Sequence, residues 1–280
     1  MVPRPFVKWA GGKTKMIPFI LSSFPDKVST YYEPFVGGGS VFFEMLRQKR
    51  FKKAVIGDSN EDLMAAFQSV QSNVEGLIKE LSAKKYRYDE TVYYRVREEE
   101  PSEDPVKRAA RFIYLNRTCF NGLYRVNRSG GFNAPFGKFT NPLICDGENL
   151  RAVSSALKGV KLALADFATV VERAKKGDAV YFDPPYLPIS KTSSFTAYNA
   201  GGFGLGDHYR LAGYFKELVS MGVSVVLSNS LSEKTRDMYS GFDIRELTGA
   251  RNIGGPAEYR SPVKEMMVVG GPAKTGEKVA

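Results

Sequence analysis

The sequence predicts an α/β fold whose sheet is interrupted by a mainly helical insertion. Short apolar runs rich in β-branched and aromatic residues, the pattern of buried strands, occur at residues 31–36 and 54–58 and again from residue 160 onward. The stretch between them has the apolar spacing of helices instead. A chain of 280 residues, 43% of them hydrophobic, is long enough to bury such a core and to carry an insertion.

The composition of the chain indicates which kinds of partner, metal site and cellular location to expect. The net charge of +10 and the sequence pI near 9.4 favour a polyanion such as nucleic acid, with a generally basic soluble protein as the alternative. Two cysteines, Cys119 and Cys145, and the single His208 do not make a disulfide framework or a four-cysteine zinc site. The first residues lack a signal-peptide pattern, and no apolar segment approaches the ~20 residues of a membrane span. We expect a soluble, cytoplasmic protein that needs no metal and contacts no membrane.

The first stretch with an unusual combination of residues is a glycine turn near the N-terminus. Trp9, the only tryptophan, precedes Gly12-Lys13-Thr14, and a short helix is expected at residues 16–21. A phosphate-binding P-loop requires a glycine five residues before Gly12, where this chain has valine. The P-loop interpretation therefore fails. The turn is either a lid over a carboxylate or phosphate group or an ordered N-terminal arm.

The next turn predicts an adenosine-containing cofactor. A strand ending near residue 36 runs into the glycines 37–39, and a helix is expected at residues 41–46. Glycines at a turn between strand and helix let the backbone approach a nucleotide closely. The second strand, residues 54–58, ends in Asp58, and an acid at this place commonly binds the ribose hydroxyls.

Helices and then a basic, aromatic stretch follow. Helices are predicted at residues 63–81, 92–97 and 105–115, and the acidic run 98–100 is most simply a solvated helix end. Residues 116–139 are the densest mixture of arginine, asparagine, glycine and aromatic residues in the chain. Arginine can read guanine, asparagine can read adenine, and an aromatic ring can wedge into a base stack. This stretch is either a hairpin that reads DNA or a glycine-rich structural hairpin.

The alternation of strands and helices returns after residue 160. The predicted strands are 160–165, 179–182, 223–230 and a closing antiparallel pair, 242–247 and 264–269. Helices are expected at 170–175 and 211–219, a polar, mobile loop at 193–206 and a disordered tail at 271–280.

The stretch Asp183-Pro184-Pro185-Tyr186, called the tetrapeptide below, ends the apolar strand 179–182. Proline has no backbone N–H and a fixed φ, so two in succession stop the strand in a rigid loop. The carboxylate and the Pro184 carbonyl are hydrogen-bond acceptors, and Tyr186 has an aromatic face. This combination suits the binding of an amino group on a flat ring. The alternative is that the prolines merely end the strand and that Tyr186 fills the core.

Together these motifs resemble the Dam-type DNA adenine-N6 methyltransferases, the D12 class. The stretches that carry the resemblance are 9–13, 33–40, 57–58 and 183–186, with 116–117, 121–125, 132–137 and 195–198. It runs from about residue 5 to residue 269 and implies a Rossmann-like methyltransferase sheet with an inserted, mainly helical DNA-recognition domain. The implied parts are a catalytic domain at 1–60 and 156–270, a target-recognition domain at 61–155 and the tail at 271–280.

The resemblance implies S-adenosylmethionine (SAM) as methyl donor, S-adenosylhomocysteine as product and no metal. The implied cofactor-binding residues are Trp9, Lys13, Phe35, Gly37, Gly39, Asp58, Asp166, Phe167 and Asp183. Catalysis would depend on Asp183, Pro184 and Tyr186, which would hold the N6 amino group of a flipped-out adenine while it attacks the methyl group in line.

The same resemblance places the DNA contacts on the hairpin. The implied residues are Phe120, Asn121, Leu123, Arg125 and Pro135. Arg125 would read a guanine, and Phe120 would prop the duplex near the flipped base. Many relatives have tyrosine at the position of Phe120, so the aromatic wedge survives here but a hydroxyl contact to DNA does not. The implied target is GATC in double-stranded DNA, and the implied enzyme is a prokaryotic or phage-encoded monomer, with or without a cognate restriction endonuclease.

Two other functions stay open at this stage. A methyltransferase for RNA or for a protein glutamine would share the cofactor motifs. The basic stretch 116–139 argues against a protein substrate, and aspartate rather than asparagine at the head of the tetrapeptide fits adenine. A catalytically silent DNA-binding protein would have a damaged tetrapeptide, and here the tetrapeptide is intact.

Overall fold

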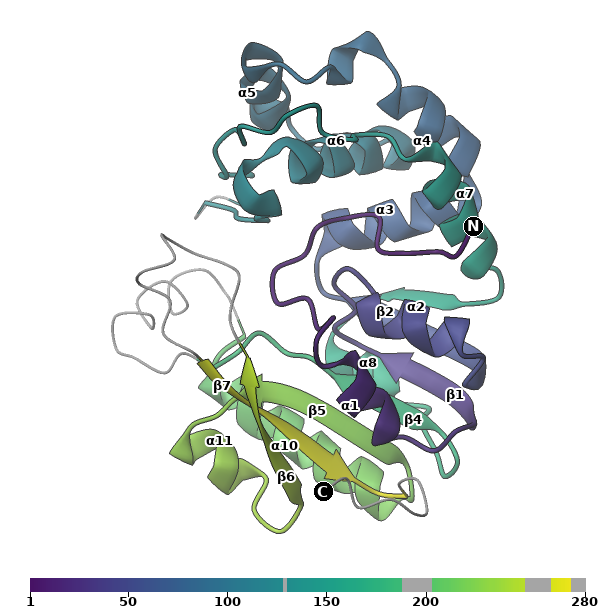
Figure 1. Ribbon diagram of the computed structural model, residues 1–280, viewed down its shortest axis with the longest axis vertical. Helices are drawn as coiled ribbons and strands as arrows, with labels where there is room; N and C mark the ends of the chain where they lie inside the picture. The colour runs from purple at the N-terminus through teal and green to yellow at the C-terminus, as the bar shows by residue number, and fades with distance from the viewer. Residues whose placement is uncertain (128–129, 188–202, 250–262, 273–280) are drawn as a thin grey trace.

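A seven-stranded mixed sheet is the framework of the molecule, and a group of helices stands at one end of it (Figure 1). The computed structural model describes residues 1–127, 130–187, 203–249 and 263–272. The strands are β1 (Val28–Glu33), β2 (Phe51–Asp58), β3 (Lys161–Leu164), β4 (Ala179–Phe182), β5 (Ser224–Ser230), β6 (Asp243–Gly249) and β7 (Val263–Gly270). The helices that flank the sheet are α1 (Ile17–Ser22), α2 (Ser40–Arg47), α8 (Phe167–Val171), α10 (Leu205–Ser220) and α11 (Glu233–Met238).

The strand order is β3-β2-β1-β4-β5-β7-β6, in which β1 to β5 are parallel and β7 is antiparallel to both of its neighbours. The predicted α/β class and the predicted closing antiparallel pair are therefore confirmed. The chain order reverses between β1 and β4. Ligands of open α/β sheets bind outside the carboxyl ends of the strands at such a reversal.

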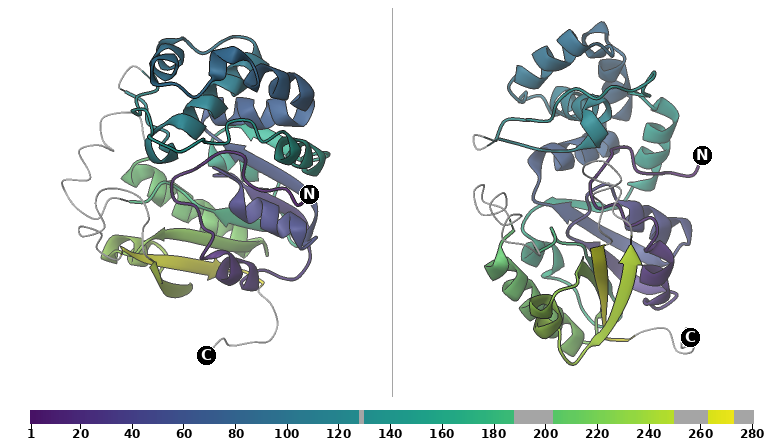
Figure 2. Two further views of the ribbon diagram at one scale, coloured as in Figure 1. Left: turned by 45° about the horizontal axis from the view of Figure 1, so that its top comes forward. Right: turned by 60° about the vertical axis from the view of Figure 1, so that its left-hand side comes forward.

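Side chains of the central strands alternate between two cores, one on each face of the sheet. In β5, Val225 and Leu227 pack with residues of α8 and α10, whereas Val226 belongs to the core on the opposite face, with residues of α1 and α2. Figure 2 shows the sheet lying between these layers of helices. Burial on both faces explains why β4 is a continuous apolar run in the sequence.

The helices between β2 and β3 form the group at one end of the sheet (Figure 1). They are α3 (Glu61–Ser72), α4 (Val74–Leu81), α5 (Glu90–Glu98), α6 (Pro105–Thr118) and α7 (Gly147–Ala156), with short 3-10 turns at Lys84–Tyr86 and Phe120–Gly122. The single helix expected at 63–81 is divided, because Asn73 leaves helical geometry and its side chain caps α4 by accepting from the Gly76 N–H.

Other boundaries differ from the prediction for local reasons. The helix expected at 170–175 instead begins at Phe167, because the Asp166 side chain caps it by accepting from the Ala168 N–H. Residues 116–118, expected in the hairpin, continue α6. Residues 193–202 of the expected loop and 273–280 of the expected tail lie outside the described residues. Within the described ranges, no helix is both long and apolar enough to cross a membrane.

Candidate active site

The carboxyl ends of three adjacent strands bring three acids to one edge of the sheet. β1 ends at Glu33, β2 ends at Asp58, and Asp183 directly follows β4. Because β1 lies between β2 and β4, the tetrapeptide and the glycine turn 37–39 leave the sheet at neighbouring positions. This is the crevice position that the strand order predicts.

The N-terminal turn is joined to the tetrapeptide by an ion pair. Lys13, only 5% exposed, places Nζ 2.8 Å from Oδ1 of Asp183, whose side chain is 20% exposed. Burial raises the pKa of the Asp183 carboxyl, and the charge of Lys13 opposes that rise. The same ammonium donates to the Gly11 carbonyl at 2.6 Å and lies 4.9 Å from the centre of the Tyr186 ring. The N-terminal turn is therefore packed against the tetrapeptide through Lys13.

Side chains of β5 and β7 form hydrogen bonds with the tetrapeptide and with the residue that follows it. Ser230 on β5 donates its hydroxyl to the carbonyl of Leu187, the residue after the tetrapeptide, at 2.9 Å. The Tyr186 hydroxyl donates to Oε2 of Glu265 on β7 at 3.1 Å. These contacts and the two prolines fix the direction in which Asp183 leaves the strand.

The glycine turn packs too closely for side chains at two positions. Gly37 has φ +48°, and a Cβ there would lie 2.5 Å from the Trp9 ring. Gly39, at φ +76°, precedes the first residue of α2, and a Cβ there would lie 3.1 Å from the Phe43 ring. The Gly37 N–H donates to Oδ2 of Asp58 at 3.2 Å, so the turn is tied to the end of β2.

Asp58 is a partly buried acceptor with capacity for a further ligand. Its carboxylate accepts the backbone N–H groups of Asn60, at 3.0 Å, and Gly37. Burial raises the pKa of Asp58, and these N–H groups oppose the rise. Each carboxylate oxygen has two lone pairs, so hydroxyl groups can still donate to it.

Aromatic rings lie at the ends of β1 and β3. Phe35 stacks on Phe167 with centroids 5.7 Å apart, and the edge of Phe203 meets Phe35 at 5.4 Å. Arg210 of α10 forms a two-point ion pair with Asp166, at 3.2 and 2.6 Å, and its guanidinium lies 4.4 Å from the Phe167 centroid. Asp166 and Phe167 thus lie in one cluster with Phe35, and both contact Arg210, a residue to which the sequence pattern assigned no role.

The residues at this edge fit SAM by their chemistry. Rings at Phe35 and Phe167 suit a planar base, Asp58 suits a pair of hydroxyls, and the opposite charges of Lys13 and Asp183 suit the two charged groups of an amino acid. Among the described residues, no group of three or more histidine, cysteine, aspartate and glutamate side chains could hold a metal ion.

The basic, aromatic stretch after α6 folds as an irregular hairpin. Isolated antiparallel bridges join Cys119 to Phe136 and Val126 to Phe132. The predicted DNA-contacting residues lie together on it: Phe120 is 50% exposed, Asn121, Arg125 and Pro135 are exposed, and Leu123 is partly buried. The Phe120 N–H donates to the Pro135 carbonyl at 2.8 Å. The Arg125 guanidinium donates across the hairpin to the Asn133 carbonyl, at 2.6 and 3.2 Å.

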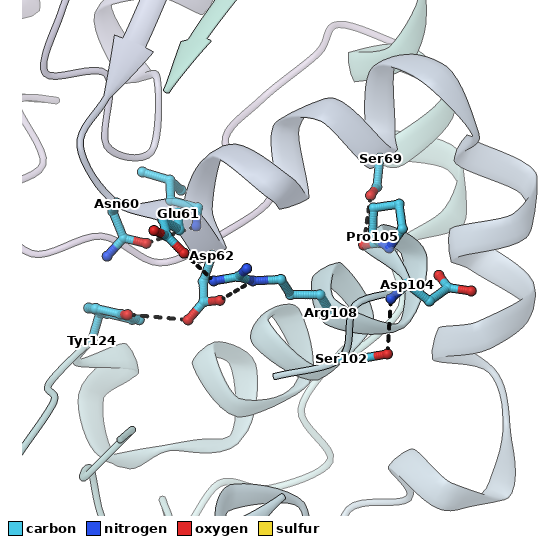
Figure 3. A network of polar contacts seen from close by, with 10 residues as sticks. Asn60, Glu61, Asp62, Ser69, Ser102, Asp104, Pro105, Arg108 and Tyr124 are labelled. Atoms are coloured by element: carbon cyan, nitrogen blue, oxygen red, sulfur yellow. Dashed lines mark hydrogen bonds and ion pairs between the residues drawn. The ribbon is translucent and has the colours of Figure 1, made fainter. Parts of the chain in front are cut away.

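Tyr124 ties this hairpin to Asp62 of α3, as Figure 3 shows, and its ring also contacts the N-terminal turn. Its hydroxyl donates to Oδ2 of Asp62 at 3.3 Å, and Arg108 donates to the other oxygen of Asp62 at 2.7 Å. The Tyr124 ring stacks on Trp9, with centroids 5.6 Å apart and planes 25° apart. The Tyr124 side chain thus links Trp9 to α3, and Tyr124 directly precedes Arg125 in the hairpin.

Sequence reasoning missed several residues of the site. It assigned no role to Glu33, Tyr124, Arg210 or Glu265. A glutamate within the apolar run of β7 was a usable signal for Glu265, because a charge beside buried strand residues needs a partner. Arg210 gives no such signal, since one exposed arginine on a helix is ordinary.

Comparison with known proteins identifies the family. Residues 9–253 match the family described as D12 class N6 adenine-specific DNA methyltransferase. A type II methyltransferase of Methanocaldococcus jannaschii is 42% identical, over 96% of this chain and 99% of its own. One of Lactococcus lactis is 40% identical over 95% and 94%, and the DNA adenine methylase of Escherichia coli K12 is 34% identical over 95% of each chain. The chain therefore belongs to the D12 class of N6 adenine-specific DNA methyltransferases.

Proposed function

We propose that this enzyme methylates N6 of an adenine flipped out of double-stranded DNA, within the sequence GATC, with SAM as donor. The observation that carries the proposal is the partly buried Asp183 carboxylate, held 2.8 Å from Lys13 on a rigid proline loop at the chain reversal between β1 and β4. An acceptor in this place can bind an exocyclic amino group beside a cofactor crevice.

The cofactor would lie along the carboxyl ends of β1 and β2. When bound, SAM supplies an electrophilic methyl group. Asp58 would accept from the ribose hydroxyls, Phe35 and Phe167 would face the adenine ring, and Lys13 would neutralise the amino-acid carboxylate. The remaining proposed cofactor-binding residues are Trp9, Gly37, Gly39, Asp166 and Asp183.

The target adenine would be activated by two acceptors. Its amino lone pair is delocalised into the ring and is a poor nucleophile. Hydrogen bonds from N6 to Asp183 and to the Pro184 carbonyl would favour a tetrahedral nitrogen and localise that lone pair, while Tyr186 stacks on the base. As the N–C bond forms, the bond between the methyl carbon and the sulfonium sulfur would break with its electron pair left on sulfur, and N6 must lose a proton. Asp183 is a suitable acceptor, because its raised pKa makes it a stronger base than an exposed aspartate.

Residues 61–155 would form the target-recognition domain. Arg125 would leave its contact with Asn133 to read a guanine, with Phe120, Asn121, Leu123 and Pro135 beside it. GATC is supported by the resemblance of the Asn121-to-Arg125 stretch to Dam-type enzymes, and the net charge of +10 suits a phosphate backbone.

The proposed working enzyme is a monomer, with or without a cognate restriction endonuclease. A DNA substrate would place it with the genome, in a prokaryotic cytoplasm.

Transfer of labelled methyl groups tests the substrate directly. Purified enzyme and labelled SAM are incubated with unmethylated duplex DNA, with RNA of the same sequence and with protein, and Asp183→Ala serves as the control. We expect label only in the DNA and only with the unsubstituted enzyme. Label in RNA or protein, with none in DNA, would refute the proposal.

A further inference from the structure

Glu265 lies within hydrogen-bond distance of the Tyr186 hydroxyl and can therefore restrict the orientation of the tyrosine ring. It is partly buried on β7, paired in register with Ser230 of β5 and Leu247 of β6. One of its carboxylate oxygens accepts the Tyr186 hydroxyl at 3.1 Å. Its negative charge also contributes to the raised pKa of Asp183, so the two carboxyl groups belong to one electrostatic cluster.

Neighbouring residues of β5 and β7 hold different parts of the same loop. Ser230, the register partner of Glu265, donates its hydroxyl to the Leu187 carbonyl at 2.9 Å, which anchors the backbone beside Tyr186. A tyrosine side chain has two torsions, and a fixed hydroxyl restricts both of them. The ring is therefore held at its backbone and at its hydroxyl, with the Lys13 ammonium 4.9 Å from its centre.

We propose that Glu265 is a positioning residue that orients the Tyr186 ring for stacking on the target adenine, through the hydrogen bond from the tyrosine hydroxyl. This inference rests on the proposed function of the tetrapeptide. A hydroxyl bound to a carboxylate is a charge-assisted pair, stronger than a bond between neutral groups. Without it, the ring can rotate away from the stacking orientation, and the flipped base loses one wall of its pocket.

A double-mutant cycle measures this role. Tyr186→Phe, Glu265→Ala and the double variant are compared for kcat/KM on a duplex with one target site and for fluorescence of 2-aminopurine at the target adenine. Each single variant should lower kcat/KM about tenfold, the size expected for a lost bond to a charged acceptor. The double variant should lose no more than either single one, because one hydrogen bond is removed in all three. Glu265→Gln, which keeps an acceptor, should stay within about threefold of the unsubstituted enzyme.

Controls separate orientation from a general loss of structure. Tyr209→Phe and Glu217→Ala, at exposed positions on α10, should leave rate and fluorescence unchanged. Glu265→Ala should keep the thermal midpoint and the affinity for S-adenosylhomocysteine. If the losses in kcat/KM multiply to about a hundredfold in the double variant, or if Glu265→Ala binds S-adenosylhomocysteine more weakly, this inference is overturned, while the proposed function stands. An unsubstituted enzyme that methylates no adenine would refute the proposed function, and this inference with it.

Discussion

The buried carboxyl of Glu33 leads to a quantitative prediction of how the stability of the protein changes with pH. The residue ends β1 with only 2% of its surface exposed. Its carboxyl contacts the Tyr31 hydroxyl at 2.7 Å and the backbone N–H of Phe42. Burial raises the pKa of Glu33 from 4.5 to about 8, and the negative charge of Asp183 adds to the rise.

The sign and size of the effect follow from proton linkage. In the unfolded chain Glu33 loses its proton near pH 4.5, and in the folded protein near pH 8. Between these values the folded state binds more protons, so the free energy of unfolding falls as pH rises. At about 1.4 kcal/mol per pH unit, the loss between pH 5.5 and 8.5 is about 3 kcal/mol.

The substitution Glu33→Gln removes this dependence. The amide stays neutral, and it can accept from the Phe42 N–H and donate to Tyr31. Urea denaturation at pH 5.5 and 8.5 gives the free energy of unfolding of both proteins. The variant should gain about 3 kcal/mol relative to the unsubstituted protein between the two pH values.

The matched control is Glu44→Gln, because Arg47 holds the pKa of the Glu44 carboxyl below its usual range and it does not titrate above pH 5.5. Its stability difference from the unsubstituted protein should be the same at both pH values. The reasoning fails if Glu33→Gln also shows a constant difference, since Glu33 would then be ionised in the folded protein at neutral pH.

Three further predictions concern the reaction. Asp183→Ala should reduce methyl transfer in single-turnover assays by about 10²–10³-fold or more while duplex binding persists; substantial surviving activity would refute its role. Arg125→Ala should cost about 1–3 kcal/mol of discrimination at one base pair, measured as rates on duplexes substituted at each position, and an unchanged preference would refute the hairpin assignment. Gly37→Ala forces a Cβ within 2.5 Å of Trp9 and should weaken S-adenosylhomocysteine binding about tenfold or more in calorimetry. Unaltered affinity would show that the turn does not shape the cofactor site.

Local signals made much of the framework predictable. Asp183 ends the apolar run 179–182, in which every residue is buried, and Asp58 ends the run 54–57, in which only Val55 is partly exposed. The two prolines after Asp183 and the glycines at 37 and 39 restrict the backbone by their own chemistry. Each of these inferences needed only residues adjacent in the sequence.

Contacts between distant segments could not be predicted in the same way. Tyr186 and Glu265 are 79 residues apart and meet only because β7 lies beside β5. Arg210 reaches Asp166 across 44 residues, from a helix expected to begin later in the chain. That helix begins at Leu205 because the Asp207 side chain accepts from the Gly204 N–H at 2.9 Å, within a stretch whose glycines favour a loop.

The central claim is adenine-N6 methylation at GATC, and mapping of the modified base at single-nucleotide resolution tests it most directly. Plasmid DNA is taken from methylation-deficient cells that express this chain, with cells expressing Asp183→Ala as the control. The account predicts N6-methyladenine confined to GATC and absent from the control. Methylation at another sequence would contradict the assignment of the site. The absence of methylated adenine, from folded protein that binds SAM, would contradict the proposed reaction itself.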